Sequence, residues 1–346
     1  WTLQHGQVEI RESTAPVTVD GKAYPAGSYV VLTQQPFGGY AKSLLERQKY
    51  PNLFEYPGGP PKRPYDVTAH TLPLLFGVDV AAVMGSPPPP TGPLVAAVRP
   101  PAYSVPSLSG VSTKRIAIYK SYAESMDEGW TRYVLDSYKI PYTPMFDKDV
   151  RAGNLNARFD VVIIPSQSAN GIIRGVAAAY PDSLKGGLGE KGAEVFSLFV
   201  EQGGTLLAFN DASDYAIEAL KLPVKNVLAG VRPTEFYAPG SILGVELDKT
   251  HPIAKTFAAT VPAIWFENGP AFEITDPTQA VVVAKYAASG NPLLSGWLLG
   301  AQRINGKAAL VDVTKGKGHV VLFGFRPQYR GQSVATYPLV WGAMLR

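Results

Sequence analysis

The sequence contains no cysteine, few histidines and no long apolar run. Its 346 residues include four histidines. The lack of cysteine excludes disulfide bonds, thiolate nucleophiles and cysteine-ligated zinc. No apolar stretch approaches the roughly 18 residues that a membrane-spanning helix needs, so we expect no membrane span. The chain opens at Trp1 without a basic-then-apolar signal segment, and we interpret it as a fragment or processed form of a longer protein.

Charge of either sign is also sparse. Charged residues make up 17% of the chain, and 32 Lys and Arg against 28 Asp and Glu leave a formal net charge of +4. No run of basic residues could follow a phosphate backbone, which argues against nucleic acid as a partner. Hydrophobic residues make up 46%, enough for a sizeable core, and the length favours about two domains. The composition therefore predicts a globular protein.

Proline is plentiful, and it is concentrated in one segment. Residues 85–112 contain PPPPTGP and several further prolines. Because proline fixes φ and removes a backbone donor, this density favours an extended connector over a strand or helix. The connector divides the chain into a small α+β module, residues 1–84, and a larger unit, residues 113–346.

Strands and helices alternate in the larger unit. Apolar strands such as FDVVIIP and TLLAF are separated by amphipathic helices such as MDEGWTRYVLDSYK. This alternation implies right-handed crossovers and a mostly parallel sheet covered on both faces. After residue 240, strand-like segments follow one another across short turns, which predicts antiparallel additions and a closing helix over 333–345. The expected fold class is doubly wound α/β.

Polar side chains follow the predicted strands. In an open α/β sheet, ligands bind beyond the carboxyl ends of the strands, so we expect these side chains to converge on one cleft. The candidate ligand-binding residues are Ser121, Asp127, Ser166, Gln167, Asp211, Asp214, Glu267 and Arg330, and the tip of the last strand adds Arg326 and Gln328.

The order of these elements resembles a class I glutamine amidotransferase-like domain. FDVVIIP, GGTLLAFN and VVLFGFRPQ carry the resemblance. Enzymes of that class place a cysteine on a sharp turn after the strand equivalent to GTLLAF, and a His and a Glu at the end of a late strand. The resemblance assigns these positions to Asn210, Arg326 and Gln328. An amide cannot replace the thiolate, a guanidinium cannot act as a base and Gln carries no charge, so amide hydrolysis by that route is excluded.

Longer stretches resemble the C-terminal part of bacterial zinc carboxypeptidase-family proteins. They include NDASDYAIEALKLPVKNVLAG, EFYAPGSILGVELDKTHPIA and GFRPQYRGQSVATYPLVW. The resemblance implies a parent metallocarboxypeptidase with an N-terminal peptidase domain as partner, in a secreted or periplasmic location. The family's zinc site needs a His-x-x-Glu pair, and no histidine here is followed by Glu at that spacing. We therefore expect neither zinc nor another cofactor in this chain.

Several candidates also have a structural interpretation. Asp211 and Asp214 lie at a helix start, where carboxylates cap the backbone. Arg326 and Arg330 suit a bound carboxylate or phosphate, or an ion pair with Asp211, Asp214 or Glu267 that holds the cleft shut. The stretch SMDEGW likewise predicts a helix start, with its first Ser as cap and its Glu completing a capping box.

Three functions remain open at this point. The first is a non-catalytic accessory region that supports the peptidase domain or binds a peptide or glycan. The second is a hydrolase of altered chemistry that uses Asp211 or Asp214 with Arg326. The third is a structural or oligomerisation module, which predicts a homo-oligomer and a cleft filled by its own side chains.

Overall fold

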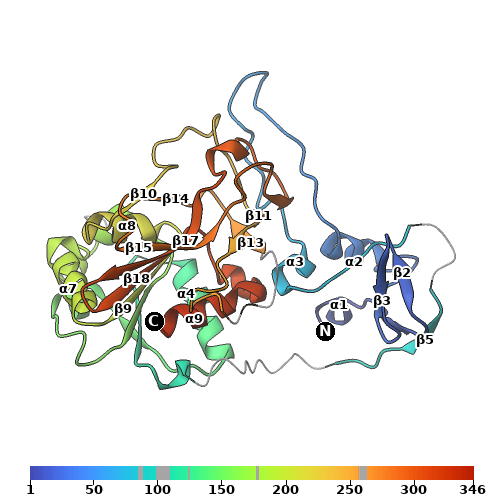
Figure 1. Cartoon of the computed structure of the whole chain (residues 1–346), viewed down its shortest axis with the longest axis horizontal. Helices are drawn as coiled ribbons and strands as arrows, with labels where there is room; N and C mark the ends of the chain where they lie inside the picture. The colour runs from blue at the N-terminus through green and yellow to red at the C-terminus, as the bar shows by residue number, and fades with distance from the viewer. Residues whose placement is uncertain (85–88, 99–109, 124, 177–178, 256, 258–262) are drawn as a thin grey trace.

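The structure is a computed structural model, and it describes residues 1–84, 89–98, 110–123, 125–176, 179–255, 257 and 263–346 (Figure 1). Much of the expected connector, at 85–88 and 99–109, lies outside the described residues. Within the described part of the chain, none of the helices is both long and apolar enough to cross a membrane.

The N-terminal part combines short antiparallel strands with short helices. β1 (Arg11–Ser13) pairs antiparallel with β4 (Tyr29–Val30) and β5 (Thr91–Leu94), beside the hairpin of β2 (Val17–Val19) and β3 (Lys22–Tyr24). Its helices are α1 (Thr2–His5), α2 (Gly38–Leu45) and α3 (Leu72–Phe76).

β5 corrects the expectation that the proline-rich segment avoids strands. Its residues Thr91 and Leu94 pair with Ser13 and Arg11 of β1, and Pro93 lies within the strand. β5 is an edge strand, and proline is tolerated there because a missing donor can face away from the neighbouring strand.

The large sheet has a parallel half and an antiparallel half. The parallel strands, in spatial order, are β7 (Thr143–Met145), β6 (Ile116–Tyr119), β8 (Val161–Ile164), β9 (Thr205–Phe209) and β18 (Gly318–Phe323). The antiparallel half comprises β17 (Ala308–Lys315), β14 (Phe272–Ile274), β10 (Val224–Asn226), β15 (Ala280–Lys285) and β12 (Glu246–Leu247). A separate antiparallel sheet contains β13 (Ala263–Phe266), β11 (Ser241–Gly244) and β16 (Leu293–Ser295).

Helices cover both faces of the parallel half, which confirms the doubly wound α/β class. The side chains of β8 alternate between two cores, with Val161 and Ile163 on one face and Val162 and Ile164 on the other. The first core is closed by α4 (Met126–Ser137) and the expected C-terminal helix α9 (Tyr337–Met344). The second core contains side chains of α5 (Asp147–Arg151), α6 (Ala169–Arg174), α7 (Gly189–Glu201) and α8 (Ala212–Ala219). Short 3₁₀ turns lie at Val111–Thr113, Asp182–Leu184, Ala301–Arg303, Tyr329–Gly331 and Val334–Thr336.

Residues 46–77, which we call the arm, contact the large unit extensively. Lys49 forms an isolated bridge with Gly296, next to β16. The N–H groups of Thr68 and Ala69 donate to the carbonyl of Gly240 at 2.9 and 3.0 Å. Leu75 of α3 is buried in a small core that also contains β11 and β13 side chains. The arm, although part of the 1–84 segment, therefore contributes to the packing of the larger unit.

Candidate functional site

The ends of β9 and β18 bring two of the candidate segments together. Phe209 pairs with Phe323 in register, and the N–H of Asn210 donates to the carbonyl of Phe323 at 2.8 Å. The strand order reverses between β6 and β8, which is where doubly wound sheets place their ligands. Ser121 follows β6 and Ser166 follows β8. This edge of the sheet therefore brings together the segments that follow β6, β8, β9 and β18.

Asn210 occupies a sharp turn directly after β9. Its φ of 49° lies in the left-handed region, where asparagine is more common than most residues with a Cβ. Its buried amide donates from Nδ2 to Oγ of Ser166 at 3.2 Å. A Cβ added at Gly269 would lie 2.1 Å from Oδ1 of Asn210, so the amide fills the space between neighbouring loops. The turn matches the position that the amidotransferase resemblance assigns to a nucleophile, but the side chain packs as structure.

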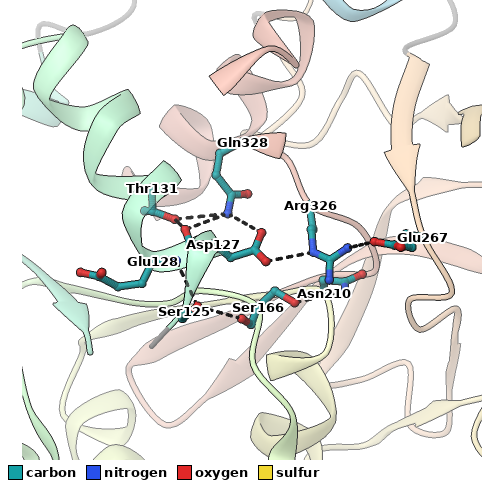
Figure 2. Close-up of polar contacts among 9 residues, drawn as sticks. All are labelled: Ser125, Asp127, Glu128, Thr131, Ser166, Asn210, Glu267, Arg326 and Gln328. Atoms are coloured by element: carbon teal, nitrogen blue, oxygen red, sulfur yellow. Dashed lines mark hydrogen bonds and ion pairs between the residues drawn. The ribbon is translucent and has the colours of Figure 1, made fainter. Parts of the chain in front are cut away.

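Arg326 lies between two carboxylates (Figure 2). Its Nη1 donates to Oε2 of Glu267 at 2.6 Å, and its Nε lies 3.2 Å from Oδ2 of Asp127. The guanidinium carbon also lies 5.6 Å from the ring centre of Trp265. Only 17% of the arginine side chain is exposed. The protein itself therefore supplies both carboxylates that neutralise this largely buried guanidinium.

Gln328 is buried against the start of α4. Its Nε2 donates to Oγ1 of Thr131 at 3.2 Å and to the main-chain oxygen of Asp127 at 3.4 Å (Figure 2). The side chain is 2% exposed. Gln328, the residue to which the resemblance assigns the glutamate position, therefore connects the tip of β18 to α4.

The site contains more carboxylates than cations. We call Asp127, Asp211, Glu267 and Arg326 the Arg326 cluster. Burial raises the pKa of Asp127, with Asp211 and Glu267 adding to the effect and Arg326 opposing it. Burial also raises the pKa of Asp211, again against the pull of Arg326. For Arg326, burial disfavours the charge, but the surrounding carboxylates outweigh it and raise the pKa.

Asp211 and Asp214 lie at the start of α8 as predicted, but the predicted capping hydrogen bond to the side chain of Asp211 is absent. The partly buried side chain of Asp211 instead interacts with the charge of Arg326 and with the hydroxyl of Ser166. Asp214 accepts two hydrogen bonds from Nδ2 of Asn226, at 2.9 and 3.1 Å, and it also interacts with the charge of Asp211. The alternating pattern of the sequence could not reveal the contact with Asn226, which lies on a short edge strand.

The start of α4 follows the capping prediction only in part. Oγ of Ser125 accepts from the N–H of Glu128 at 3.2 Å, as a cap should. The side chain of Glu128 instead pairs with Arg132 one turn later, at 2.8 Å. An oppositely charged residue four positions further along a helix therefore competes for the carboxylate.

Arg330 lies outside the Arg326 cluster. Its Nη1 donates to Oδ2 of Asp66, in the arm, at 2.8 Å, and its guanidinium lies over the ring of Tyr329. Tyr329 in turn stacks on Trp265, with ring centres 3.4 Å apart and planes within 5°. Arg326, Trp265, Tyr329 and Arg330 therefore form a continuous stack from the cluster to the arm. Sequence reasoning did not identify Asp66, because its turn-rich surroundings carry no pattern that points to a residue so distant in the chain.

Ser121 and Gln167 lie beside a cavity at the switch point. Nε2 of Gln167 donates to Oγ of Ser121 at 3.0 Å. The cavity holds about 10 Å³, room for a single water molecule. The described residues contain no group of three or more His, Cys, Asp or Glu arranged to hold a metal ion.

A second polar cluster lies near the opposite end of the parallel strands. Asp312 of β17 is 3% exposed and has Nδ1 of His319 at 3.0 Å, Nε2 of His251 at 3.3 Å and Nε of Arg346 at 2.8 Å. Nδ1 of His251 accepts from the N–H of Ile253 at 3.3 Å. The sequence interpretation missed this cluster, since its members come from separate elements with no shared motif.

Comparison with known proteins gives distant structural likenesses. No family model matches the chain, and no curated protein matches it. The cytoplasmic protein STM3548 from Salmonella typhimurium is 16% identical, with a TM-score of 0.42, and the match covers 67% of this chain and 97% of that one. A ThuA-like protein from Bacteroides uniformis is 11% identical, with a TM-score of 0.38 and coverages of 66% and 90%. A β-galactosidase from Bacillus circulans is 15% identical, with a TM-score of 0.38 and coverages of 65% and 30%.

Proposed function

We propose that residues 113–346 are a non-catalytic accessory domain of a zinc carboxypeptidase-like protein, outside the cytoplasm, and that their strand-end site is closed by the Arg326 cluster. The observation that carries the proposal is the pairing of Arg326 with both Asp127 and Glu267. A guanidinium fixed between carboxylates can neither accept a proton nor attack a carbonyl. The three positions that the resemblance assigns to catalysis are thus occupied by side chains that hold the fold together.

The small size of the switch-point cavity supports a structural role over ligand binding in the cleft. Small-molecule sites usually enclose hundreds of cubic ångströms, whereas this cavity holds about 10 Å³. A peptide or glycan bound there would have to displace Gln167 or the Arg326 cluster. Supporting a neighbouring peptidase domain requires no such displacement.

Activity assays test the proposal directly. The purified chain should give no turnover of glutamine, simple amides, esters or aryl glycosides beyond that of its Asp211→Ala variant. Metal analysis of the same chain should give less than one zinc per molecule. Turnover that the variant abolishes, or stoichiometric zinc, would overturn the proposal.

A hydrolase of altered chemistry is the second candidate. One observation favours it, namely that Asp127 and Asp211 are both buried beside a cation and both have raised pKa values. Such groups are found at many acid–base sites. It predicts a pH–rate profile that changes when Asp127 or Asp211 becomes Asn.

The oligomerisation alternative instead predicts a light-scattering mass that rises with concentration.

A further inference from the structure

The loop of residues 47–65 exposes large apolar side chains. Figure 1 shows it within the long excursion between α2 and α3. Tyr65 is fully exposed, Tyr56 is 63% exposed, and Leu53 and Phe54 are each 39% exposed. Isolated apolar side chains on a surface need no explanation, but four within one loop indicate an interaction surface. We call residues 47–65 the tyrosine loop.

The backbone of the tyrosine loop is braced. The N–H of Glu55 donates to the carbonyl of Pro60 at 3.0 Å, and the N–H of Lys62 donates to the carbonyl of Leu53 at 2.9 Å. A Cβ at Gly59 would lie 2.7 Å from the ring of Tyr56, so glycine lets this ring pack on the backbone. A braced loop loses little conformational entropy when a partner binds.

The base of the tyrosine loop is fixed to the large unit. Tyr50 stacks on Trp297 with ring centres 5.8 Å apart, and Phe54 meets the same indole edge-on at 6.3 Å. The N–H of Tyr50 also donates to the carbonyl of Gly296 at 3.2 Å. The exposed side chains are therefore presented from a rigid base.

The tyrosine loop also carries most of the chain's excess positive charge. It contains one acidic residue, Glu55, against four basic ones, a formal excess of three in a chain whose net charge is +4. The acidic residues that flank the loop are already paired, Glu46 with Lys42 and Asp66 with Arg330. The basic residues are Arg47, Lys49, Lys62 and Arg63.

We propose that the tyrosine loop is a docking surface for an acidic protein segment that also carries apolar side chains. Carboxylates of the partner would pair with Lys62 and Arg63, which are both exposed. Apolar groups of the partner would pack on Tyr56 and Tyr65. Tyrosine and arginine on a rigid support are typical of protein-binding hot spots, whereas a nucleic acid needs a longer basic track. The proposal does not depend on the state of the Arg326 cluster.

Fluorescence anisotropy with the full chain and a labelled random copolymer of glutamate and tyrosine tests the proposal. Binding should weaken at least about tenfold in Lys62→Glu/Arg63→Glu and in Tyr56→Ser/Tyr65→Ser. The matched controls are Lys148→Glu/Lys249→Glu, at exposed lysines elsewhere, and Tyr29→Ser, at a tyrosine that is 70% exposed on β4. The controls should bind as the unmodified chain does. Equal melting temperatures would show that all variants fold.

Three outcomes would overturn the proposal. The first is no copolymer binding, and the second is binding that the loop and control variants weaken equally. The third is stronger binding of an acidic polysaccharide such as polygalacturonate, which would make the loop a glycan site. In the absence of copolymer, the light-scattering mass of the chain could instead rise with concentration and fall in the loop variants. That result would make a second copy of the chain the occupant and would exclude an acidic foreign segment.

Discussion

Arg326 is one cation among three carboxylates, so its removal should lower the stability of the fold. Without the guanidinium, Asp127 and Asp211 would remain buried beside Glu267 with no opposite charge. Breaking a buried ion pair by removing one partner costs more than the pair itself contributes. We expect Arg326→Ala to lower the free energy of unfolding by about 3 kcal/mol at neutral pH, measured by urea denaturation.

Arg330 provides the matched control for this measurement. It comes from the same strand tip and also lies over an aromatic ring, but its partner Asp66 is half exposed. Exposed pairs contribute at most about 1 kcal/mol, because solvent screens them. Equal losses for Arg326→Ala and Arg330→Ala would contradict the importance of burial in the Arg326 cluster.

Asp211 should be replaceable by its neutral isostere. Burial raises the pKa of Asp211 in the folded state, so the folded protein favours the protonated carboxyl. The stability that this protonated carboxyl contributes is therefore lost as the pH rises above 3.8, the ordinary pKa of an aspartate. Asp211→Asn should therefore leave the unfolding free energy at neutral pH unchanged or increased. The difference from the unmodified chain should shrink as the pH falls toward 3.8. A clear loss of stability at neutral pH would mean that the charge of Asp211 is needed to hold Arg326.

His251 should make the protein less stable in mild acid. Burial and then Arg346 lower its pKa from 6.5, against the opposing pull of Asp312 and Asp248. His319 lies on the other side of Asp312, and the Nδ1 atom of His251 already accepts a hydrogen bond, so its neutral form fits the site. Since the folded-state pKa is lowered, stability is lost as the pH falls below 6.5.

Urea midpoints measured on either side of pH 6.5 check this expectation. His251→Gln should reduce the pH dependence, while His70→Gln should not, because His70 is exposed. If the urea midpoint of His251→Gln depends on pH as strongly as that of the unmodified chain, another group causes the loss of stability in acid.

At the scale of elements, the tip of β18 is held by stacked rings and guanidinium groups. Tyr329 packs face to face on the fully buried Trp265, and its hydroxyl has no hydrogen-bond partner within the described residues. The ring of Tyr329 should therefore contribute to the stability of the fold, and its hydroxyl should not. We expect Tyr329→Ala to cost about 3 kcal/mol and Tyr329→Phe less than about 0.5 kcal/mol, measured by urea denaturation. A large cost for Tyr329→Phe would indicate a hydrogen bond through water.

The elements that the sequence predicted well are those that a repeating pattern defines. β8 and β9 are buried on both faces and read as continuous apolar runs. β7 and α5 were missed, because they span only three and five residues, and β7 contains Pro144. The strand-end position of Arg326 followed from the same patterns. Its partners did not, since Glu267 and Asp127 lie 59 and 199 positions away, and no local pattern encodes such pairing.

At the scale of the whole molecule, the arm links the N-terminal residues to the larger unit. Thr68, Ser241 and Trp297 form a buried hydrogen-bond cluster between them, with Oγ1 of Thr68 2.9 Å from Oγ of Ser241. Composition could identify the proline-rich segment 85–112 as a boundary. It could not show that the arm, which precedes this boundary, packs in the core of the unit that follows it. The stack from Arg326 to Arg330, which ends in the ion pair with Asp66, also connects the arm to the larger unit at the tip of β18.

Truncation distinguishes an integral arm from an independent module. A chain that begins at residue 46 keeps the arm, whereas one that begins at residue 111 loses Leu75, which packs in the core with Trp265, and Tyr50, which covers Trp297. Losing both should cost several kcal/mol, and each kcal/mol lowers the melting temperature by about 2–4 °C in a unit of this size. We therefore expect the shorter chain to melt at least about 10 °C lower by calorimetry and to bind a hydrophobic dye, while the longer one melts near the intact protein. Equal melting temperatures for the two truncated chains would show that the arm only rests on the surface, because a buried apolar contact cannot be removed without loss of stability.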